Sequence, residues 1–139
     1  MILYDIDCMD FIKEFSENDK FAKHLGIELV EMSKGRAKAK MKIKKIHLNA
    51  VNTVHGGAIF TLADFAFAIA ANTHGNISVA LNVNISFLKA VSEGTLVAEA
   101  EEVSINPKIA TYNIRILNEH NELIATFQGM AYRKEKFLK

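Results

Sequence analysis

Apolar and polar residues alternate along several short segments of the chain, which is typical of β-strands that bury one face. Residues 36–43 show this most clearly, with apolar side chains separated by three lysines. A turn at Ser33-Lys34-Gly35 precedes them, so we predict a hairpin of residues 26–34 and 36–43 with one lysine-rich, solvated face. Further turn residues divide the second half of the chain into four more predicted strands, at residues 77–88, 94–105, 109–118 and 122–133.

A different pattern occupies residues 58–71, where almost every side chain is apolar and Asp64 is the single ionisable group. A helix without a polar face must be enclosed by other elements. The run is shorter than the roughly 20 residues that a membrane span needs, so we predict a central helix buried in the protein. Residues 7–24 mix apolar and charged residues at three- and four-residue spacings, with a break near residues 16–18, and predict a helical cap.

Two strands, one apolar helix and four strands, with connections too short for crossover helices, predict an α+β fold. We expect a curved, largely antiparallel sheet wrapped around one long central helix, with an N-terminal helical cap. The 139 residues have the length of one domain, and 50% of them are hydrophobic, which suffices for a core. The prediction is a single domain of residues 1–139, with the cap in residues 1–25 and the core in residues 26–133.

Charge and cysteine content exclude several classes of function. The 17 basic and 16 acidic residues leave a formal charge of +1, so no overall field attracts nucleic acid or an anionic membrane. Cys8 is the only cysteine, which excludes a disulfide within the chain and a cysteine pair for zinc. Three histidines in loop-like places, His47, His74 and His120, lack metal-ligand spacing, and we predict no metal site. The N-terminus does not read as a secretory signal, so we expect a cytoplasmic protein.

Asp64 is the first candidate for chemistry. Burial of a carboxylate is costly, and the usual response is a raised pKa or a compensating hydrogen bond, either of which suits a catalyst. Its place in the middle of the predicted helix excludes the common role of a carboxylate as N-cap. The alternative is a structural aspartate paired with a basic residue or with backbone donors.

Gly56 and Gly57 lie where the loop enters the helix. Backbone N–H groups at this positive end can polarise a carbonyl and bind the oxyanion that forms when it is attacked. The alternative is a purely structural turn. His55 precedes the glycines and fits a hydrogen-bonded positioning residue better than a general base.

The spacing of these candidates has a geometric consequence. Gly56 and Asp64 are eight residues apart, which corresponds to about 12 Å along one helix. A catalytic carboxylate and an oxyanion donor must both reach the same group within roughly 3 Å. If both are catalytic, two copies of the helix must run antiparallel past each other, so that Asp64 of one subunit faces Gly56 of the other. A two-fold dimer would then hold two equivalent sites.

Three motifs together resemble the hot-dog thioesterases of the phenylacetate-degradation type: Asn49, the stretch Val54-His55-Gly56-Gly57-Ala58-Ile59-Phe60-Thr61-Leu62-Ala63-Asp64, and Asn82-Val83-Asn84-Ile85-Ser86-Phe87-Leu88-Lys89. The similarity covers residues 26–133 and is most specific in residues 55–64. It implies the hot-dog fold, in which the sheet wraps the central helix. It also implies homodimers with a continuous sheet and shared active sites, which usually associate further into homotetramers.

The resemblance implies a reaction and roles for individual residues. The reaction is hydrolysis of an acyl-CoA thioester to a carboxylic acid and free CoA, without metal or cofactor. Asp64 corresponds to the nucleophile or general base, and the Gly56 N–H to the group that polarises the carbonyl. Asn49 matches an asparagine that places the attacking water or the carbonyl, and His55 a residue that buttresses the site.

One departure from the family pattern concerns the strand after the helix. Some relatives use a serine there, and the nearest position in this chain is Ala80. The departure leaves the water-holding role to Asn49 or Asn82.

Substrate contacts are predicted at Gly57, at Asn82 and Asn84 on one strand face, and at three cations that could meet the CoA phosphates. The cations are Lys89, at a position that is often basic in the family, Lys108 and Arg115. The alternatives are solvated surface charges for the cations and cross-strand hydrogen bonds for the asparagines.

Two other functions compete with the thioesterase. A non-catalytic acyl-CoA-binding protein fits the same fold, but the joint presence of Asn49, Gly56 and Asp64 argues against it. A hot-dog dehydratase would pair a histidine with an acidic residue in a different local context, which His55 before two glycines fits poorly. The identity of the acyl group stays open.

Overall fold

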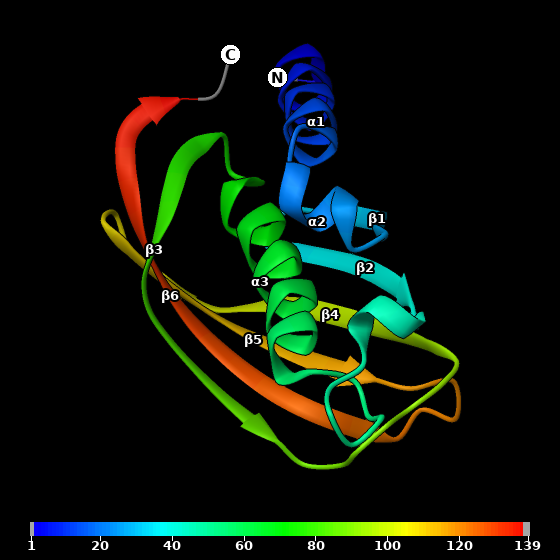
Figure 1. Ribbon diagram of the computed structural model, residues 1–139. Coiled ribbons are helices and arrows are strands. Elements are labelled where there is room, and N and C mark those ends of the chain that lie inside the picture. Colours follow the sequence, from blue (N-terminus) through cyan, green and yellow to red (C-terminus); the bar gives the residue numbers. More distant parts are fainter. Residues whose placement is uncertain (1, 138–139) are drawn as a thin grey trace.

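The computed structural model describes residues 2–137 and places one long helix in the concave face of a curved sheet (Figure 1). Residues 1 and 138–139 of the predicted domain lie outside the described residues. The elements in chain order are α1 (Ile2–Glu17), α2 (Lys20–His24), β1 (Ile27–Ser33), β2 (Arg36–Lys42), the short 3-10 helix η1 (Lys45–His47), α3 (Gly56–Asn72), β3 (Asn76–Phe87), β4 (Thr95–Ile105), β5 (Ile109–Leu117) and β6 (Leu123–Phe137). The predicted α+β fold with a central helix is confirmed.

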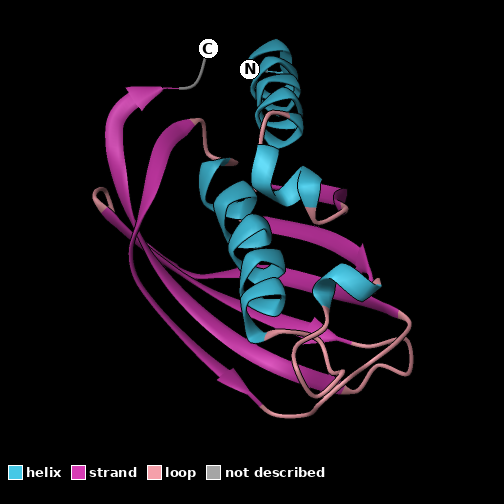
Figure 2. Ribbon diagram, viewed as in Figure 1, coloured by secondary structure: helices cyan, strands magenta, loops and turns pink. Residues whose placement is uncertain are grey.

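The sheet has six antiparallel strands in the order β1-β2-β4-β5-β6-β3. β3 follows the helix in sequence and pairs only with β6, so it forms one edge of the sheet, and β1 forms the other. Figure 2 shows the helices gathered on the concave side of these strands. The 12-residue β3 therefore presents one unpaired backbone edge alongside α3.

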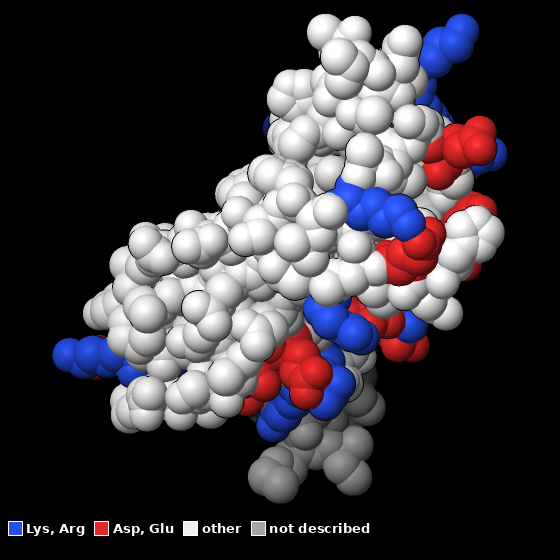
Figure 3. All heavy atoms as spheres, turned by 90° about the horizontal axis from the view of Figure 1, so that it is seen from below, with Lys and Arg blue, Asp and Glu red and all other residues white. Residues whose placement is uncertain are grey.

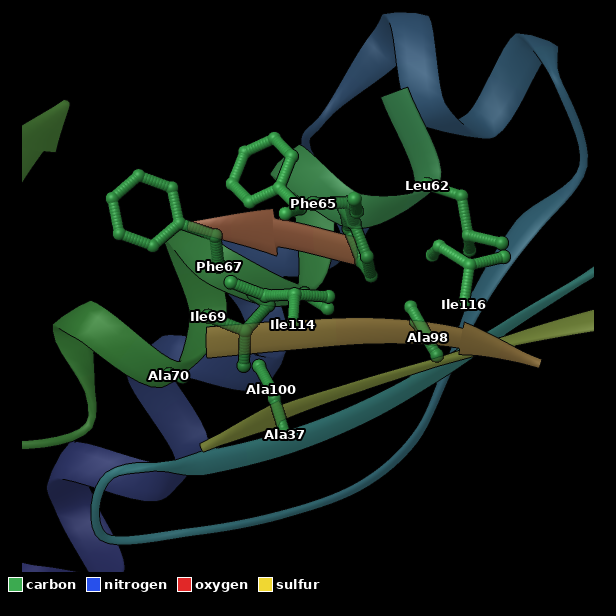
Figure 4. Packing of buried hydrophobic residues seen from close by; sticks show 14 of the residues in the cluster. Ala37, Leu62, Phe65, Phe67, Ile69, Ala70, Ala98, Ala100, Ile114 and Ile116 are labelled. Atoms are coloured by element: carbon green, nitrogen blue, oxygen red, sulfur yellow. The ribbon is translucent and has the colours of Figure 1, made fainter. Parts of the chain in front are cut away.

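Small side chains on the sheet allow α3 to pack closely against it. Figure 4 shows alanines of β2 and β4 near larger side chains of α3 and β5; the labelled examples are Ala37, Ala98 and Ala100, and Leu62, Ile69, Ile114 and Ile116. This enclosure explains why α3 has almost no polar face. Among the described helices, none is long and apolar enough to cross a bilayer.

The cap and the C-terminal strand differ slightly from the sequence-based boundaries. The helical region breaks between α1 and α2, where the Asp19 side chain accepts a hydrogen bond from the Ala22 N–H at 3.0 Å and caps α2. α1 begins at Ile2 rather than residue 7. β6 extends to Phe137 instead of residue 133, because its last residues pair with Asn76 at the start of β3.

Gly129 on β6 is a point of close contact between sheet and helix. A β-carbon at this position would lie 2.7 Å from the ring of Phe67, which also contacts the rings of Tyr112 and Phe127. We expect Gly129→Ala to lower the free energy of unfolding by about 1–3 kcal/mol, as overpacked cores do, measured by chemical denaturation. Combined with Phe67→Leu, the loss should be less than additive; strict additivity would show that the ring contact is not the cause.

Candidate active site

Asp64 lies on the side of α3 that faces β3, at the edge of the sheet. It lines a hollow of about 190 Å³ between α3, β3 and β6, here called the Asp64 hollow. Its other lining residues are Phe67, Ala68 and Ala71 of α3, Ser78, Val79 and Ala80 of β3, and Ala131 of β6. The predicted carboxylate therefore borders a small and mainly apolar space.

The Asp64 carboxylate is partly buried, and it forms no hydrogen bond or ion pair with the described side chains of residues 9–136 or with the described backbone. Burial raises the pKa of the Asp64 carboxyl, and the nearby negative charge of Asp19 raises it further. Within the described part of the chain, no basic residue or backbone donor holds Asp64 as the structural alternative would require. Asp64 has unoccupied oxygen lone pairs beside a hollow, which suits a base or a nucleophile.

Asp19 gives a way to test the electrostatic setting of Asp64. Because its charge raises the Asp64 pKa, Asp19→Asn is expected to lower that pKa and to shift the acidic limb of the pH profile of kcat/KM to lower pH. Asparagine is also a good N-cap, so α2 should stay intact. The measurement is the pH–rate profile of the variant and the parent; a shift to higher pH would contradict the account.

The start of α3 carries the second candidate group. His55 is the N-cap, and its Nδ1 accepts a hydrogen bond from the Gly57 N–H at 2.8 Å. The Ala58 and Ile59 N–H groups donate to the His55 carbonyl oxygen. Of these first donors of the helix, only the Gly56 N–H has no acceptor in the described part of the chain. It is a free donor at the positive end of α3, as an oxyanion site requires.

The same geometry corrects the role predicted for Gly57. Its N–H is bonded to His55 and is therefore not available to a substrate. Gly57 instead leaves room for the imidazole, since a β-carbon there would lie 3.0 Å from His55 Nδ1.

The backbone of His55 is held by a buried residue that the sequence did not single out, His47. The His55 N–H donates to the His47 carbonyl oxygen at 2.7 Å. His47 is buried, with Nδ1 accepting from the Lys44 N–H at 2.9 Å and Nε2 donating to the Leu25 carbonyl oxygen at 2.8 Å. The only feature of the sequence that could have indicated the burial of His47 is its place between the apolar residues Ile46 and Leu48. Its position in a loop-like segment suggested an exposed side chain instead.

The capping role of His55 can be separated from other roles. His55→Ala removes the acceptor for the Gly57 N–H and is expected to cost about 1 kcal/mol of stability. Because the helix start would loosen, kcat/KM should fall about 10- to 100-fold. His55→Asn keeps a capping acceptor and should recover most of both losses, measured by thermal denaturation and steady-state kinetics. Equal losses in the two variants would show that the imidazole itself is required.

Asn49 and Gly56 line a second hollow, of about 360 Å³, together with Phe87 and Lys89, here called the Gly56 hollow. The Asn49 Oδ1 accepts from the Val51 and Thr53 N–H groups at 3.0 and 3.1 Å, and its Nδ2 donates to Thr53 Oγ1 at 2.9 Å. The amide oxygen is thus committed to its own loop. One Nδ2–H of Asn49 is left for a water or a carbonyl.

Lys89 is the one predicted cation that borders a candidate hollow. Its Nζ forms an exposed ion pair with Glu122. Exposed pairs contribute little to stability, so Lys89 can exchange Glu122 for a phosphate at small cost. Figure 3 shows charges of both signs beside a wide uncharged area on one face. On this face, an anion would therefore be attracted by individual cations and not by a continuous positive surface.

Three of the predicted substrate contacts lie away from both hollows. Asn84 and Arg115 line a hollow on the outer face of the sheet, opposite α3. Side chains alternate between the two faces of a strand, and the residues on either side of Asn84 and Arg115 point inward toward α3. Arg115 donates to Glu99 there at 2.7 Å. Lys108 lies in the exposed turn before β5 and borders neither the Asp64 hollow nor the Gly56 hollow.

Asn82 and Ala80 flank an irregularity of β3. The register with β6 shifts between these residues, and Asn82 pairs with Met130. Ala80 lines the Asp64 hollow, whereas Asn82 lines neither of the two hollows. Of the two asparagines predicted to hold water, only Asn49 borders one of the two hollows.

The two hollows share no lining residue, and each contains one half of the predicted chemistry. The free carboxylate of Asp64 lies in one and the free N–H of Gly56 in the other, about 12 Å away along α3. β3 borders both hollows, with Ser78, Val79 and Ala80 lining the Asp64 hollow and Phe87 lining the Gly56 hollow. A single chain therefore holds two half-sites along the unpaired edge of its sheet.

Known proteins resemble this chain in sequence and in fold. A family model described as the Thioesterase superfamily matches residues 51–125. A protein of Archaeoglobus fulgidus with a provisional esterase name is 49% identical over 118 residues, covering 84% of this chain and 77% of that protein. The acyl-coenzyme A thioesterase PaaI of Escherichia coli is 38% identical over 118 residues, 84% of either chain. The solved structure of an E. coli PaaI protein from the phenylacetic acid degradation operon has a TM-score of 0.90 and 33% identity, covering 95% of this chain and 96% of that one.

Proposed function

We propose that the substrate of this protein is an acyl-CoA and that two subunits share each active site. The first part of the proposal follows from the family, because this chain belongs to the thioesterase superfamily and is a hot-dog thioester hydrolase of the PaaI-like type. The observation that carries the proposal is the pair of half-sites on the β3 edge. An unpaired carboxylate borders one and an unpaired N–H borders the other.

The β3 edge supports a two-fold dimer. β3 is an edge strand, and a long unpaired edge is a template for pairing with a strand of another chain. Its side chains Val79 and Leu81 are 42% and 54% exposed, which leaves apolar surface on the same strand. Antiparallel pairing of two β3 strands about an axis near Val83 would bring Val79 opposite the partner's Phe87. Val79 borders the Asp64 hollow and Phe87 the Gly56 hollow, so the same pairing would join the two half-sites.

In the joined site, the thioester carbonyl oxygen accepts a hydrogen bond from the partner's Gly56 N–H. Asp64 then either attacks the carbonyl carbon or removes a proton from a water that attacks it. The N–H stabilises the oxyanion, the C–S bond breaks, and CoA leaves as a thiolate that takes up a proton. On the direct route, water hydrolyses the resulting anhydride with Asp64. Both routes need ionised Asp64, and neither needs a metal or a redox cofactor.

Other predicted residues have supporting roles in this proposal. The spare Nδ2–H of Asn49 orients the water or the carbonyl, and the His55 cap fixes the helix start from which Gly56 donates. Lys89 binds a CoA phosphate at the mouth of the Gly56 hollow. We further propose that dimers pair into tetramers; the exposed Phe11 and Phe15 on α1 provide apolar surface for such contacts.

The test is a hydrolysis screen over aryl- and alkyl-CoA thioesters, read by release of free thiol, with the oligomeric state measured by light scattering. We expect steady turnover of at least one thioester by a dimer or tetramer. Binding of acyl-CoA without thiol release would favour the non-catalytic alternative. A monomer with full activity would contradict the shared site.

A further inference from the structure

Asn72 is a buried polar residue at the end of α3, and its side chain binds the backbone of the strand that follows. Its Oδ1 accepts a hydrogen bond from the Ser78 N–H at 2.9 Å. Its Nδ2 donates to the Ala68 carbonyl oxygen at 2.7 Å and to the Ser78 carbonyl oxygen at 3.4 Å. One side-chain amide therefore occupies both backbone groups of Ser78.

The backbone groups of Ser78 face the free edge of β3. In an antiparallel pair, opposite residues alternately bond to each other or point away from each other. Ser78 lies opposite Arg133 of β6, and the Arg133 N–H donates to the Lys108 carbonyl oxygen at 2.7 Å, on the β5 side of β6. Arg133 thus points away from β3, and Ser78 points away from β6. The Asn72 amide takes the place of a neighbouring strand at this position of the edge.

This cap limits the part of the edge that can pair with another strand. Because Ser78 is already bonded to Asn72, pairing with a new strand begins at Val79. It ends at Phe87, the last residue of β3, since the next N–H, that of Leu88, donates to Ile124 of the same chain at 2.8 Å. The midpoint between Val79 and Phe87 is Val83. A two-fold pair uses the same residues of both strands, so its axis lies there.

We propose that Asn72 sets the register in which a second copy of this chain pairs with β3, by capping the edge at Ser78. This inference rests on the proposed shared active site, which needs the same axis at Val83. A slip by two residues would keep the hydrogen-bond pattern but move the partner by about 7 Å along β3. Asp64 and the partner's Gly56 would then no longer reach one carbonyl group. Asn72 is thus a positioning residue, which acts through the place of the partner subunit.

A cysteine cross-link reports where the axis lies. Cys8 is the only cysteine, so Cys8→Ser gives a background for the single substitutions Asn82→Cys, Val83→Cys and Asn84→Cys. Two copies of a residue on the axis have Cα atoms about 5 Å apart, within reach of a disulfide. One residue off the axis, the copies are more than about 8 Å apart and cannot be bridged. With Asn72 in place, oxidation should give a covalent dimer mainly through Val83→Cys.

Asn72→Leu removes the cap and leaves a side chain of similar size. Ser78 then becomes available, which permits the slipped register with its axis at Asn82. The cross-link through Asn82→Cys should appear, that through Val83→Cys should decrease, and kcat should fall about 10-fold or more in the cysteine-free background. Asn76→Leu is the matched control, because this amide lies at the same end of β3 but donates to the Lys134 carbonyl oxygen of β6. It should leave both the cross-link and kcat unchanged.

The outcomes separate this inference from the function on which it rests. A parent dimer that cross-links through Asn82→Cys or Asn84→Cys instead of Val83→Cys would overturn the role of the cap. So would Asn72→Leu with a native circular dichroism spectrum and an undiminished Val83→Cys cross-link, and here the shared site would stand. Asn72→Ala repeats the comparison if the leucine variant does not fold. If the parent cross-links at none of the three positions, the β3 strands do not pair, and the shared site and this inference fail together.

Discussion

Asp64→Asn is expected to lower kcat for acyl-CoA hydrolysis by about 10²–10⁴-fold while making the folded protein more stable at neutral pH. Asparagine has nearly the same shape as aspartate, but its amide can neither attack a thioester nor take a proton from water at neutral pH. The loss should be present for every substrate, because both routes of the proposed mechanism need an ionised carboxylate.

The gain in stability follows from the direction of the pKa shift. Burial and Asp19 raise the Asp64 pKa above its ordinary value of 3.8, so the folded state binds a proton more tightly than the unfolded state does. Ionisation of Asp64 therefore destabilises the fold as pH rises through the window between 3.8 and the raised pKa. Asp64→Asn removes this effect and should unfold at a higher temperature above that window, with the advantage disappearing below it.

Thermal denaturation at several pH values and thiol-release kinetics check both halves of this prediction. Asp10→Asn, at an exposed position of α1, is the control and should change neither quantity appreciably. An active Asp64→Asn variant would remove Asp64 from the mechanism, and an inactive but less stable one would indicate a structural role for the carboxylate.

Gly56→Pro is expected to lower kcat by about 10²–10³-fold with the fold preserved, because it deletes a single oxyanion donor. Gly56 is the first residue of α3, where proline is well accepted and where the N–H has no partner within the helix. His55 has φ −59° and ψ 135°, which is compatible with a following proline. The Gly57 N–H and its bond to His55 stay in place.

Gly56→Ala provides the matched control, since it adds a β-carbon but keeps the N–H. That β-carbon would lie 3.1 Å from the ring of Phe87, which is exposed and can move by a few tenths of an ångström. The alanine variant should therefore retain far more activity than the proline variant, measured as kcat with thermal stability recorded for both. Equal activities would show that the Gly56 N–H does not polarise the carbonyl.

Much of the fold could be predicted from sequence because its signals are local. The alternation in residues 36–43 indicated β2, and the uniformly apolar run around Asp64 required an enclosing sheet, as α3 shows. The separation of Gly56 and Asp64 followed from helix geometry alone. These features depend only on the spacing of apolar residues and on the distance between residues within a single helix or strand.

The features that sequence could not give depend on which elements become neighbours. Asn84 and Arg115 lie on the outer face, a fact set by the register of β3 and β5 with β6. The hydrogen bond from the Gly57 N–H to His55 depends on the orientation of the imidazole, which the sequence does not give. Ser78 and Arg133 are more than 50 positions apart in the chain and become neighbours only because β3 pairs with β6.

The most direct test of the shared site mixes two inactive variants. Asp64→Asn and Gly56→Pro subunits, combined by refolding together, should form heterodimers in which one site has both defects and the other has neither. With equal amounts and random pairing, about one quarter of the wild-type activity should return. If each site lies within one chain, the mixture would stay as inactive as its components, and that result would contradict the account.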